Sequence, residues 1–384
     1  MRVALFLGHP AHFHMLKYAA ANLKSDGHEV FFVIKKKDIL EKLCQDANFV
    51  YYKIREGRSS SKIGLVRSVL GMEYHMSQFL RQNKVELLVG STLSFAASMI
   101  NRIDVVTMGE DDVDVVPKYA KMVYPFASCV LTPDCCDNGK WNVKSSVYPG
   151  YHELAYLHPN HFTPNREVVE GYKINMEKPY FVLRFASLNA HHDTGIKGID
   201  TGVAQRLIDI LAPRGRIYIT SERPLEPQFE QYRIHINPLD MHHVMAFASL
   251  YIGDSQTMAA ESGVLGVPFV RFNDFVGRIG YLRELEDVYE LGYGIHATPL
   301  AADSPIRRAD GSVQPSGVEA LYQIVERLVA MPAEERKTTF AARRKKMLSE
   351  KIDCAKFLTW FIENYPSSVE QARNADNRFW DKFR

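Results

Sequence analysis

The chain has few of the features that mark disulfide-bonded or metal-binding proteins. Its 384 residues include only five cysteines, an odd number without regular spacing. Such a set forms no disulfide framework and is typical of a protein from a reducing compartment. The adjacent pair Cys135 and Cys136 has no second pair at the spacing of zinc ligands, so we predict no metal site. The other cysteines are Cys44, Cys129 and Cys354.

Long apolar runs and a strong net charge are also lacking. No stretch reaches the roughly 18 apolar residues of a membrane span, and the first apolar run, at 3–7, is too short for a signal peptide. A net charge of +2 creates no field that attracts nucleic acid. We therefore predict a soluble cytoplasmic protein without a nucleic-acid partner. A basic run at 336–346 has two interpretations, a solvated helix face or a peripheral contact with the inner face of a membrane.

The chain alternates apolar runs with helical patterns in two halves. A length of 384 residues predicts two domains, and alternating strands and helices predict parallel sheets covered on both faces. The fold class is therefore α/β, with two doubly wound Rossmann-like domains facing a cleft and helices at the C-terminus. Expected strands lie at 3–8, 29–34, 49–54, 86–90, 105–109, 129–132, 180–185, 216–220, 234–236, 250–252 and 269–272.

A stretch rich in Pro, His and Asn, at 148–165, has no clear period and predicts the linker between the domains. We expect a first domain at 1–165, including this linker, and a second domain at 166–355. The remaining residues, 356–384, form a helical segment that could cross back to the first domain or pack on the second.

Residues 250–271 carry the strongest local signal. An apolar strand runs into Gly253-Asp254-Ser255, and a short helix with Glu261 leads to a second apolar strand. A βαβ unit places ligands at the carboxyl ends of its strands, and free N–H groups at the start of its helix suit a phosphate. Glu261 could accept hydrogen bonds from a ribose diol. The segment fits a nucleotide diphosphate site and an ordinary capped βαβ unit equally well.

Three stretches carry a resemblance to a known group of proteins: 10–14 (Pro-Ala-His-Phe-His), 148–157 (Tyr-Pro-Gly-Tyr-His-Glu-Leu-Ala-Tyr-Leu) and 253–268. The chain resembles the GT-B superfamily, which includes nucleotide-sugar glycosyltransferases and the non-hydrolysing UDP-N-acetylglucosamine 2-epimerases. More narrowly, it resembles a family of unknown function in that superfamily, typically found among polysaccharide genes. The resemblance implies that the second domain grips a nucleotide-sugar donor and that the first serves the acceptor.

The resemblance also implies residues of the donor site. Glu261 matches the ribose-binding glutamate, and a loop before the βαβ unit, with Asn237 and Leu239, matches the backbone that holds the base. The usual Gly-Gly of the donor loop is replaced by Gln256-Thr257, so the backbone approaches the phosphates less freely than with glycine. The donor loop corresponds to Ser255, Gln256, Thr257 and Met258.

Candidate acid–base groups follow strands of the first half. His12 and His14 come after the first expected strand, where a neutral imidazole could take a proton from an acceptor hydroxyl. One of them could instead pack at the helix start, and His12 is favoured because it is nearer the strand end. Glu110 follows a later strand and roughly matches an essential glutamate of the epimerases. For Asp112 and Asp114 we favour charges that complement a helix N-terminus.

Arg184 follows the first strand of the second half and could neutralise a diphosphate by bidentate hydrogen bonds. Ser187 and Asn189 could add hydrogen bonds, and His191 loosely matches a catalytic histidine of the epimerases. Ser91 stands where the epimerases have the aspartate of a Gly-Asp-Thr motif, which disfavours epimerisation.

We therefore predict a GT-B-type glycosyltransferase of surface polysaccharide or glycoconjugate synthesis. Its substrate is a nucleotide-diphosphate sugar, UDP-linked by preference, its acceptor is a sugar or a lipid-linked sugar, and it requires no cofactor. The alternatives are a nucleotide-sugar 2-epimerase or hydrolase, and a non-catalytic nucleotide-sugar-binding protein on the same fold.

Overall fold

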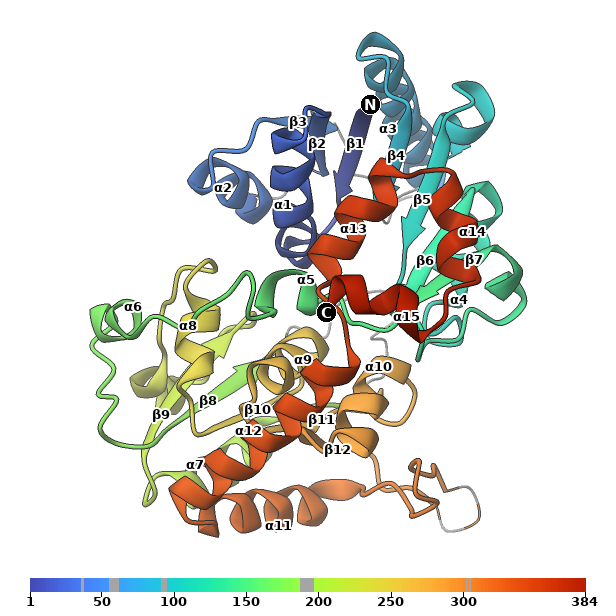
Figure 1. The fold of residues 1–384 in the computed structure, drawn as a ribbon. Helices are drawn as coiled ribbons and strands as arrows, with labels where there is room; N and C mark the ends of the chain where they lie inside the picture. The colour runs from blue at the N-terminus through green and yellow to red at the C-terminus, as the bar shows by residue number, and fades with distance from the viewer. Residues whose placement is uncertain (36–37, 55–61, 91–94, 187–196, 302, 304) are drawn as a thin grey trace. The chain divides into compact units, whose positions relative to one another are not determined.

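The computed structural model describes residues 1–384 except 36–37, 55–61, 91–94, 187–196, 302 and 304. The chain forms two compact units, each built on one parallel sheet (Figure 1). Unit 1 comprises Met1–His161 and Lys351–Arg384, and unit 2 comprises Phe162–Glu350. The C-terminal helices therefore belong to unit 1.

The sheet of unit 1 has seven strands in the order β3-β2-β1-β4-β5-β6-β7. The chain moves outward from β1 to β3 and then returns to the other side of β1, which is doubly wound topology. Val3 pairs with Val30 on one side and with Leu87 on the other. Residues Val3 to Leu7 are wholly buried, as expected for a central parallel strand covered on both faces. The strands are β1 (Arg2–Leu7), β2 (Glu29–Lys35), β3 (Tyr51–Ile54), β4 (Leu87–Gly90), β5 (Asp104–Met108), β6 (Cys129–Pro133) and β7 (Ser145–Tyr148).

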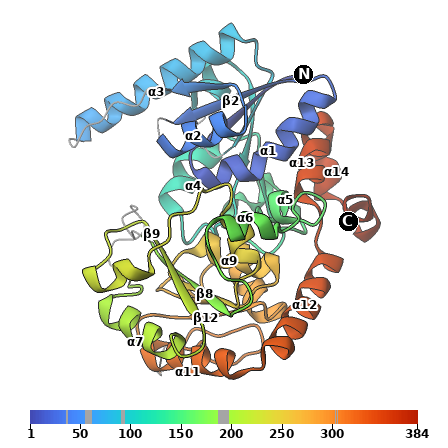
Figure 2. The ribbon, with the colours of Figure 1, turned by 90° about the vertical axis from the view of Figure 1, so that its left-hand side faces the viewer.

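Helices cover both faces of this sheet. Met72, Met76 and Phe79 recur at helical spacing and pack with Ala4 and Phe6 of β1 in one apolar cluster. Figure 2 shows their helix, α3, on one side of the sheet and α1 with α13 on the other. The helices are α1 (Pro10–Ser25), α2 (Asp38–Asp46), α3 (Lys62–Gln82), α4 (Pro117–Val123), α5 (Leu154–Leu157), α13 (Cys354–Glu363), α14 (Ser367–Arg373) and α15 (Asn377–Trp380).

The stretch expected to be a linker, 148–165, contains the boundary between the units, at His161 and Phe162, but its first part belongs to the core of unit 1. Tyr148 ends β7, and Tyr148, Tyr151 and Tyr156 are all buried within unit 1. Gly150 is required where it stands, because a Cβ there would lie 2.5 Å from Cys354 Sγ. Proline and histidine suggested a linker, but the tyrosines bury enough apolar surface to hold the segment inside.

The sheet of unit 2 has five parallel strands in the order β12-β11-β10-β8-β9. No strand forms over the described residues 234–236, and the nearest pairing is a single bridge between Ile219 and Arg233, just before them. The strands are β8 (Tyr180–Phe185), β9 (Arg216–Ser221), β10 (Leu250–Gly253), β11 (Phe269–Phe272) and β12 (Gly292–Ile295).

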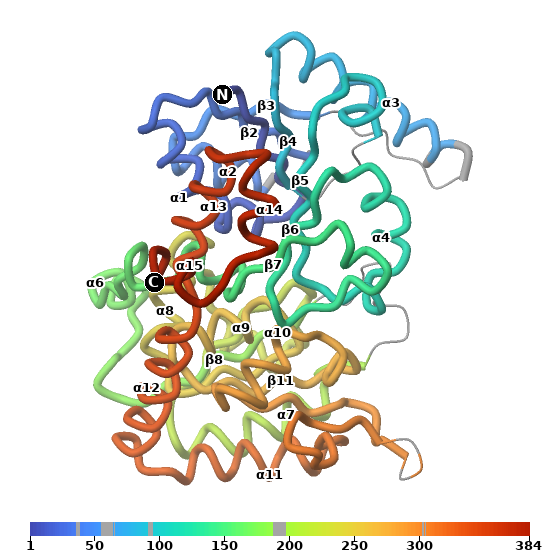
Figure 3. Tube along the Cα trace, turned by 45° about the vertical axis from the view of Figure 1, so that its right-hand side comes forward, coloured from blue at the N-terminus to red at the C-terminus, as the bar shows by residue number. Residues whose placement is uncertain are grey.

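Helices of unit 2 pack in two groups. α7 contacts α11, and these two helices lie next to each other in Figure 3, while α9 contacts both α8 and α12. A π-helical turn, Glu284–Val288, directly continues α10. The helices are α6 (Arg166–Gly171), α7 (Thr201–Leu211), α8 (Met241–Ala246), α9 (Gln256–Leu265), α10 (Gly280–Arg283), α11 (Gly317–Ala330) and α12 (Ala333–Glu350).

The basic run lies on α12, and its arginines bind other parts of unit 2. Arg336 is buried and donates to the Leu328 carbonyl at 2.8 Å, and Arg344 donates to the Val264 carbonyl at 2.8 Å. Because both carbonyls lie in the last turn of a helix, the two arginines stabilise helix ends. The run thus has a structural role, and its membrane contact stays a prediction. In the described part of the chain, no helix is long and apolar enough to cross a membrane.

Candidate functional site

The topology of unit 2 has a switch point at the carboxyl ends of β8 and β10. From β8 the chain continues through α7 to β9 on one side, and it returns through α8 to β10 on the other side. Ligands of doubly wound sheets bind at such a switch point. Arg184 near the end of β8 pairs in register with Gly253 at the end of β10. Residues after both strands therefore meet at one edge of the sheet.

Asp254 connects three segments at this edge through hydrogen bonds. Its carboxylate accepts hydrogen bonds from the amides of Ala186 at 2.6 Å and Ile199 at 3.3 Å. Its carbonyl accepts one from Asn273 Nδ2 at 2.9 Å. The residue is only 2% exposed, and burial raises the pKa of its carboxyl to about 6, although the two amides act in the opposite direction. The sequence marked Asp254 only as part of a turn, because its partners lie far away along the chain.

Asp254 gives unit 2 a distinct dependence on pH. Its pKa is higher in the folded chain than the ordinary value of 3.8, so the folded state holds the proton more tightly between pH 3.8 and about 6. This contribution to stability is complete below pH 3.8 and is lost as the pH rises through 6, by up to about 3 kcal/mol. We expect the stability deficit of Asp254→Asn, measured by urea unfolding, to shrink by that amount between pH 4 and pH 8. A deficit that stays constant over this range contradicts the assignment.

Helix α9 begins where β10 ends, as the sequence predicted. Ser255 is its N-cap, and the Ser255 hydroxyl faces the Met258 amide at 3.5 Å. Residues Ser255 to Met258 all keep intermediate exposure, so side chains of unit 2 do not bury this first turn. The amides at the start of a helix have no partner within the helix and carry a partial positive charge. The arrangement can bind an anion at the switch point.

Polar atoms lie enclosed beneath this helix start. The Tyr251 hydroxyl is buried and has no hydrogen-bond partner among the described residues, and the same holds for Arg184 Nε. A Cβ on residue 253 would lie 2.5 Å from the Tyr251 hydroxyl, which explains the glycine. The Arg184 guanidinium also forms an ion pair with Glu222. A buried polar atom without a partner costs about 1–3 kcal/mol, which a ligand or water at the site can recover.

Glu261 lies on α9 and faces the neighbouring helix. His242 of α8 lies with Nε2 2.9 Å from Glu261 Oε1, and both residues are buried. The pair joins α8 to α9 one turn behind the helix start. A contact between Glu261 and a ribose stays a prediction, and His242 is a partner that the sequence did not suggest.

In the loop expected to hold the base, the backbone amides of Asn237 and Leu239 already donate hydrogen bonds to side chains of unit 2. The Leu239 amide donates to Asn237 Oδ1 at 3.1 Å, and the Asn237 amide donates to the Tyr172 hydroxyl at 3.0 Å. That hydroxyl donates in turn to Asp240 Oδ2 at 2.7 Å. A base contact through the Leu239 amide therefore competes with an existing bond. Four residues considered in the sequence lie outside the described residues: the donor-site candidates Ser187, Asn189 and His191, and Ser91, which disfavoured epimerisation.

In unit 1 the two candidate histidines of α1 differ in environment. His12 is half-buried, and its Nδ1 accepts a hydrogen bond from the Gly8 amide at 3.2 Å. His14 is buried, with its ring 5.4 Å from that of Tyr156. His14 thus matches the packing alternative, and His12 keeps the better position for a functional role.

Glu110 follows β5 and is paired with a residue that the sequence did not single out. Its Oε1 accepts a hydrogen bond from the His152 amide at 2.7 Å, and its Oε2 lies 3.2 Å from His152 Nδ1. His152 belongs to the buried segment after β7. The sequence indicated this pair only weakly. Strand β7 was not predicted, so the residues that follow it could not be placed at the same sheet edge as Glu110.

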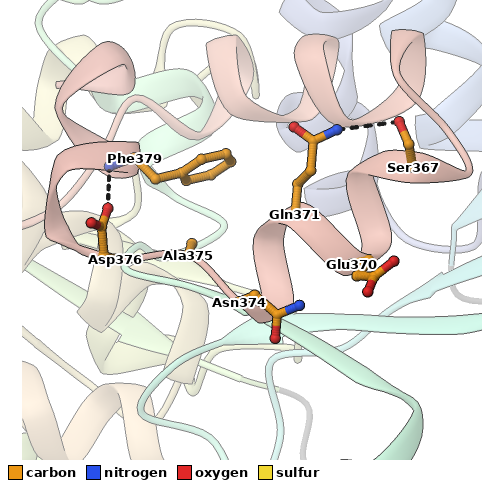
Figure 4. Close-up of a pocket in the computed structure, with 7 residues that line it drawn as sticks. All are labelled: Ser367, Glu370, Gln371, Asn374, Ala375, Asp376 and Phe379. Atoms are coloured by element: carbon orange, nitrogen blue, oxygen red, sulfur yellow. Dashed lines mark hydrogen bonds between the residues drawn. The ribbon is translucent and has the colours of Figure 1, made fainter.

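A surface pocket lies away from these residues, in unit 1. It is formed on α14 and α15, where Gln371 donates to Ser367 at 3.2 Å and the Phe379 amide donates to Asp376 at 2.9 Å (Figure 4). None of the candidate residues lines it, and we assign it no function. The lining residues are Ser367, Glu370, Gln371, Asn374, Ala375, Asp376 and Phe379.

Comparison with known proteins connects this geometry to a fold. No protein-family model and no curated protein matches the chain. Among solved structures, UDP-GlcNAc 2-epimerase from Neisseria meningitidis bound to UDP-GlcNAc aligns with a TM-score of 0.60 at 11% identity, over 97% of this chain and 100% of that one.

Two glycosyltransferases are similar in fold. The Streptomyces sp. SF2575 glycosyltransferase complexed with thymidine diphosphate aligns with a TM-score of 0.57 at 12% identity, over 94% of this chain and 99% of that one. Spinosyn rhamnosyltransferase complexed with spinosyn aglycone aligns with a TM-score of 0.58 at 12% identity, over 95% and 100%. At such identities the likeness concerns the fold, and the predicted GT-B fold class with two Rossmann-like units is confirmed.

Proposed function

We propose that the chain is an enzyme that transfers the sugar of a nucleotide-diphosphate sugar to a hydroxyl acceptor. The observation that carries the proposal is the accessible N-terminus of α9 at the switch point of unit 2. A diphosphate there accepts hydrogen bonds from the amides of Gln256 and Thr257, while Arg184 and the enclosed Tyr251 hydroxyl lie at the same edge. Stabilising the negative charge of the departing nucleotide is the main catalytic task in such a transfer.

The proposed donor is a UDP-linked sugar, and Glu261 binds its ribose from the position that His242 fixes. The loop with Asn237 and Leu239 lies before this unit and holds the base. The solved structures of similar fold contain UDP-GlcNAc, thymidine diphosphate or an aglycone, each bound to its own protein. These ligands support the class of substrate. In the proposed reaction, the N-terminus of α9 and Arg184 supply the positive charge that stabilises the departing diphosphate.

A second candidate is a nucleotide-sugar 2-epimerase or hydrolase. The pairing of Glu110 with His152 favours it, because an acid–base pair can also abstract a proton from a sugar carbon. Ser91, in place of the aspartate that the epimerases use, favours transfer. We place the acceptor, a sugar or lipid-linked sugar of surface polysaccharide or glycoconjugate synthesis, with unit 1. The reaction would take place in the cytoplasm or at the inner membrane face.

UDP binding tests the site. UDP at about 100 times its Kd should stabilise the folded protein by about 2.7 kcal/mol and raise the Tm by several degrees. We expect Glu261→Ala to abolish this rise, because it removes the ribose contact and releases His242. The measurement is thermal unfolding of each variant with and without UDP.

The matched control is Glu319→Ala, which removes an exposed glutamate from α11 of the same unit. This variant should keep the full rise in Tm with UDP. An undiminished rise in Glu261→Ala removes Glu261 from the site, and a wild-type protein that no UDP- or dTDP-sugar stabilises contradicts the proposed function.

A further inference from the structure

We propose that an exposed surface of unit 1 binds membranes that contain anionic lipids. This surface, the α3–η1 surface, lies on the outer face of α3 and on the π-helical turn η1 (Ala96–Ile100) with the residue before it. Figure 2 shows α3 along one side of the sheet of unit 1. The binding involves unit 1 alone and does not depend on the proposed transfer reaction. Six large apolar residues make up the α3–η1 surface: Val66, Leu70, Tyr74, Phe95, Met99 and Ile100.

Helix α3 carries an apolar stripe on its outer face. Val66, Leu70 and Tyr74 recur at intervals of four residues, so their side chains lie along one side of the helix. They are 59%, 64% and 59% exposed, respectively. Met72 and Met76, on the opposite side, already hold the helix to the sheet. The outer stripe is therefore not needed to pack α3 within unit 1.

Hydrogen bonds hold η1 against the same helix. The Ala96 amide donates to Glu73 Oε2 at 2.7 Å, and Asn101 Nδ2 donates to the Ser77 carbonyl at 2.9 Å. Positions 73 and 77 each follow a member of the apolar stripe by three residues, so they are its neighbours on the helix surface. The segment of η1 therefore adjoins the stripe of α3.

Three side chains of this second segment are exposed as well. Phe95, Met99 and Ile100 are 45%, 61% and 54% exposed. Large apolar side chains that are exposed singly are common on protein surfaces, whereas several on adjoining segments mark a binding surface. Contact with an apolar partner removes such side chains from water, which is favourable.

The described charges that these two segments expose are all positive. Arg67 and Arg81 lie on the outer face of α3, Arg102 follows η1, and all three are exposed. Glu73 is the only acidic residue in 62–82 and 95–103. It is buried, and one of its oxygens accepts the hydrogen bond from η1. The α3–η1 surface is therefore both apolar and positively charged.

This combination fits an anionic lipid surface. Helices that lie in a membrane interface combine an apolar face with basic residues, and lipid phosphates attract those residues. Arginine stems can lie along the apolar boundary while the guanidinium groups reach the headgroups. Tyr74, whose hydroxyl accepts from Gln78 Nε2 at 2.6 Å, has the amphipathic side chain that is enriched at this level. A second copy of the chain fits less well, because two positive surfaces repel each other.

The basic run of α12 is the alternative contact with a membrane. Arg336 and Arg344 of that run bind carbonyls at helix ends. Lys337 and Lys345 are exposed, but none of the large apolar residues of α12 is. Helix α12 thus lacks the apolar part of an interfacial surface.

Co-sedimentation with lipid vesicles tests the α3–η1 surface. We expect the wild type to bind vesicles of phosphatidylcholine with about 30% phosphatidylglycerol, and not vesicles of phosphatidylcholine alone, because the lipid charge is needed. Leu70→Glu with Met99→Glu should abolish this binding, since it places two carboxylates among the apolar residues. Arg67→Gln with Arg81→Gln should weaken it about 30-fold, since each arginine near the membrane contributes a factor of about five.

The matched controls change exposed residues outside this surface. Val143→Glu replaces an apolar residue of unit 1 that is 80% exposed, and Lys337→Gln with Lys345→Gln removes two charges of α12. Both should bind the vesicles as the wild type does. The Tm of every variant should stay close to that of the wild type, because all the changed side chains are exposed. The rise in Tm with UDP should persist in each of them, so the proposed function is tested separately.

The outcomes are distinguishable. Binding that is lost in Leu70→Glu with Met99→Glu and kept in both controls supports the lipid contact. Binding that survives this double change, or a wild type that does not bind the phosphatidylglycerol vesicles, overturns it. A loss confined to the α12 variant also overturns it and places the contact on α12. Light scattering tests a second copy as the partner: a wild-type dimer that becomes a monomer in Leu70→Glu with Met99→Glu assigns the surface to self-association and overturns the lipid contact.

Discussion

Glu286→Gln is expected to lower the free energy of unfolding of unit 2 by about 3–5 kcal/mol, because it leaves Arg271 as an uncompensated buried charge. Arg271 lies on β11 and is 0% exposed. Its Nε donates to Glu286 Oε1 at 3.0 Å, and its Nη2 lies 2.9 Å from the same oxygen. Neither Nη1 nor Nη2 has a hydrogen-bond partner within the described part of the chain, so Nε makes the only hydrogen bond of the guanidinium there. Glu286 is thus the charge that makes burial of the guanidinium tolerable.

Urea unfolding of two further variants checks this reason. Glu290→Gln breaks a pair with Arg343 that is largely solvent-exposed, and it should cost no more than about 1 kcal/mol. Removing both buried charges, in Arg271→Met with Glu286→Leu, should recover most of the loss, since replacing a buried ion pair by apolar residues is often neutral. A double variant as unstable as Glu286→Gln shows that lost packing, and not the orphaned charge, determines the effect.

Periodicity in the sequence predicted most strands of both sheets. The run Val3 to Leu7 of β1 is apolar at every position, which is typical of parallel strands covered on both faces. The run at 234–236, Ile-His-Ile, has only two apolar residues and forms no strand. A pattern of three residues does not reveal whether a neighbouring strand is there to pair with. The predicted linker contains the boundary between the units at 161–162, but its first part, 148–157, is core, because buried tyrosines outweigh the proline and histidine there.

Some features of the candidate site were likewise predictable from the sequence, and others were not. Ser255 and the start of α9 were predictable, because the cap, the helix and the flanking strands are adjacent in the sequence. Asp254 with Ile199, Glu261 with His242, and Glu110 with His152 were not, because each pair joins residues far apart in the chain. A sequence shows which residue types follow a strand. Only the order of strands in the sheet shows which of them meet.

Asp353 offers the second large effect, at the point where the chain re-enters unit 1. Asp353 Oδ1 accepts from the Lys356 amide at 3.1 Å and from His161 Nε2 at 2.8 Å, and its Oδ2 accepts from Asn160 Nδ2 at 3.0 Å. The residue is the N-cap of α13 and is 2% exposed. Asp353→Ala removes a helix cap and leaves three partly buried donors without their acceptor, so we expect a loss of about 3 kcal/mol in unfolding free energy.

The matched control is Asp376→Ala, which removes an exposed N-cap from α15 and a single hydrogen bond at 2.9 Å, at an expected cost of about 1 kcal/mol.

The effect of Asp353→Ala should also depend on pH. Burial raises the pKa of Asp353, but the hydrogen bonds from His161, Lys356 and Asn160 outweigh burial and hold it below the ordinary value of 3.8. A lowered pKa contributes stability above pH 3.8 that is lost as the pH falls through the folded value. The difference in unfolding free energy between wild type and Asp353→Ala should therefore be full at pH 6 and shrink towards pH 2, and a difference that grows on acidification contradicts this account of how the C-terminal helices are attached.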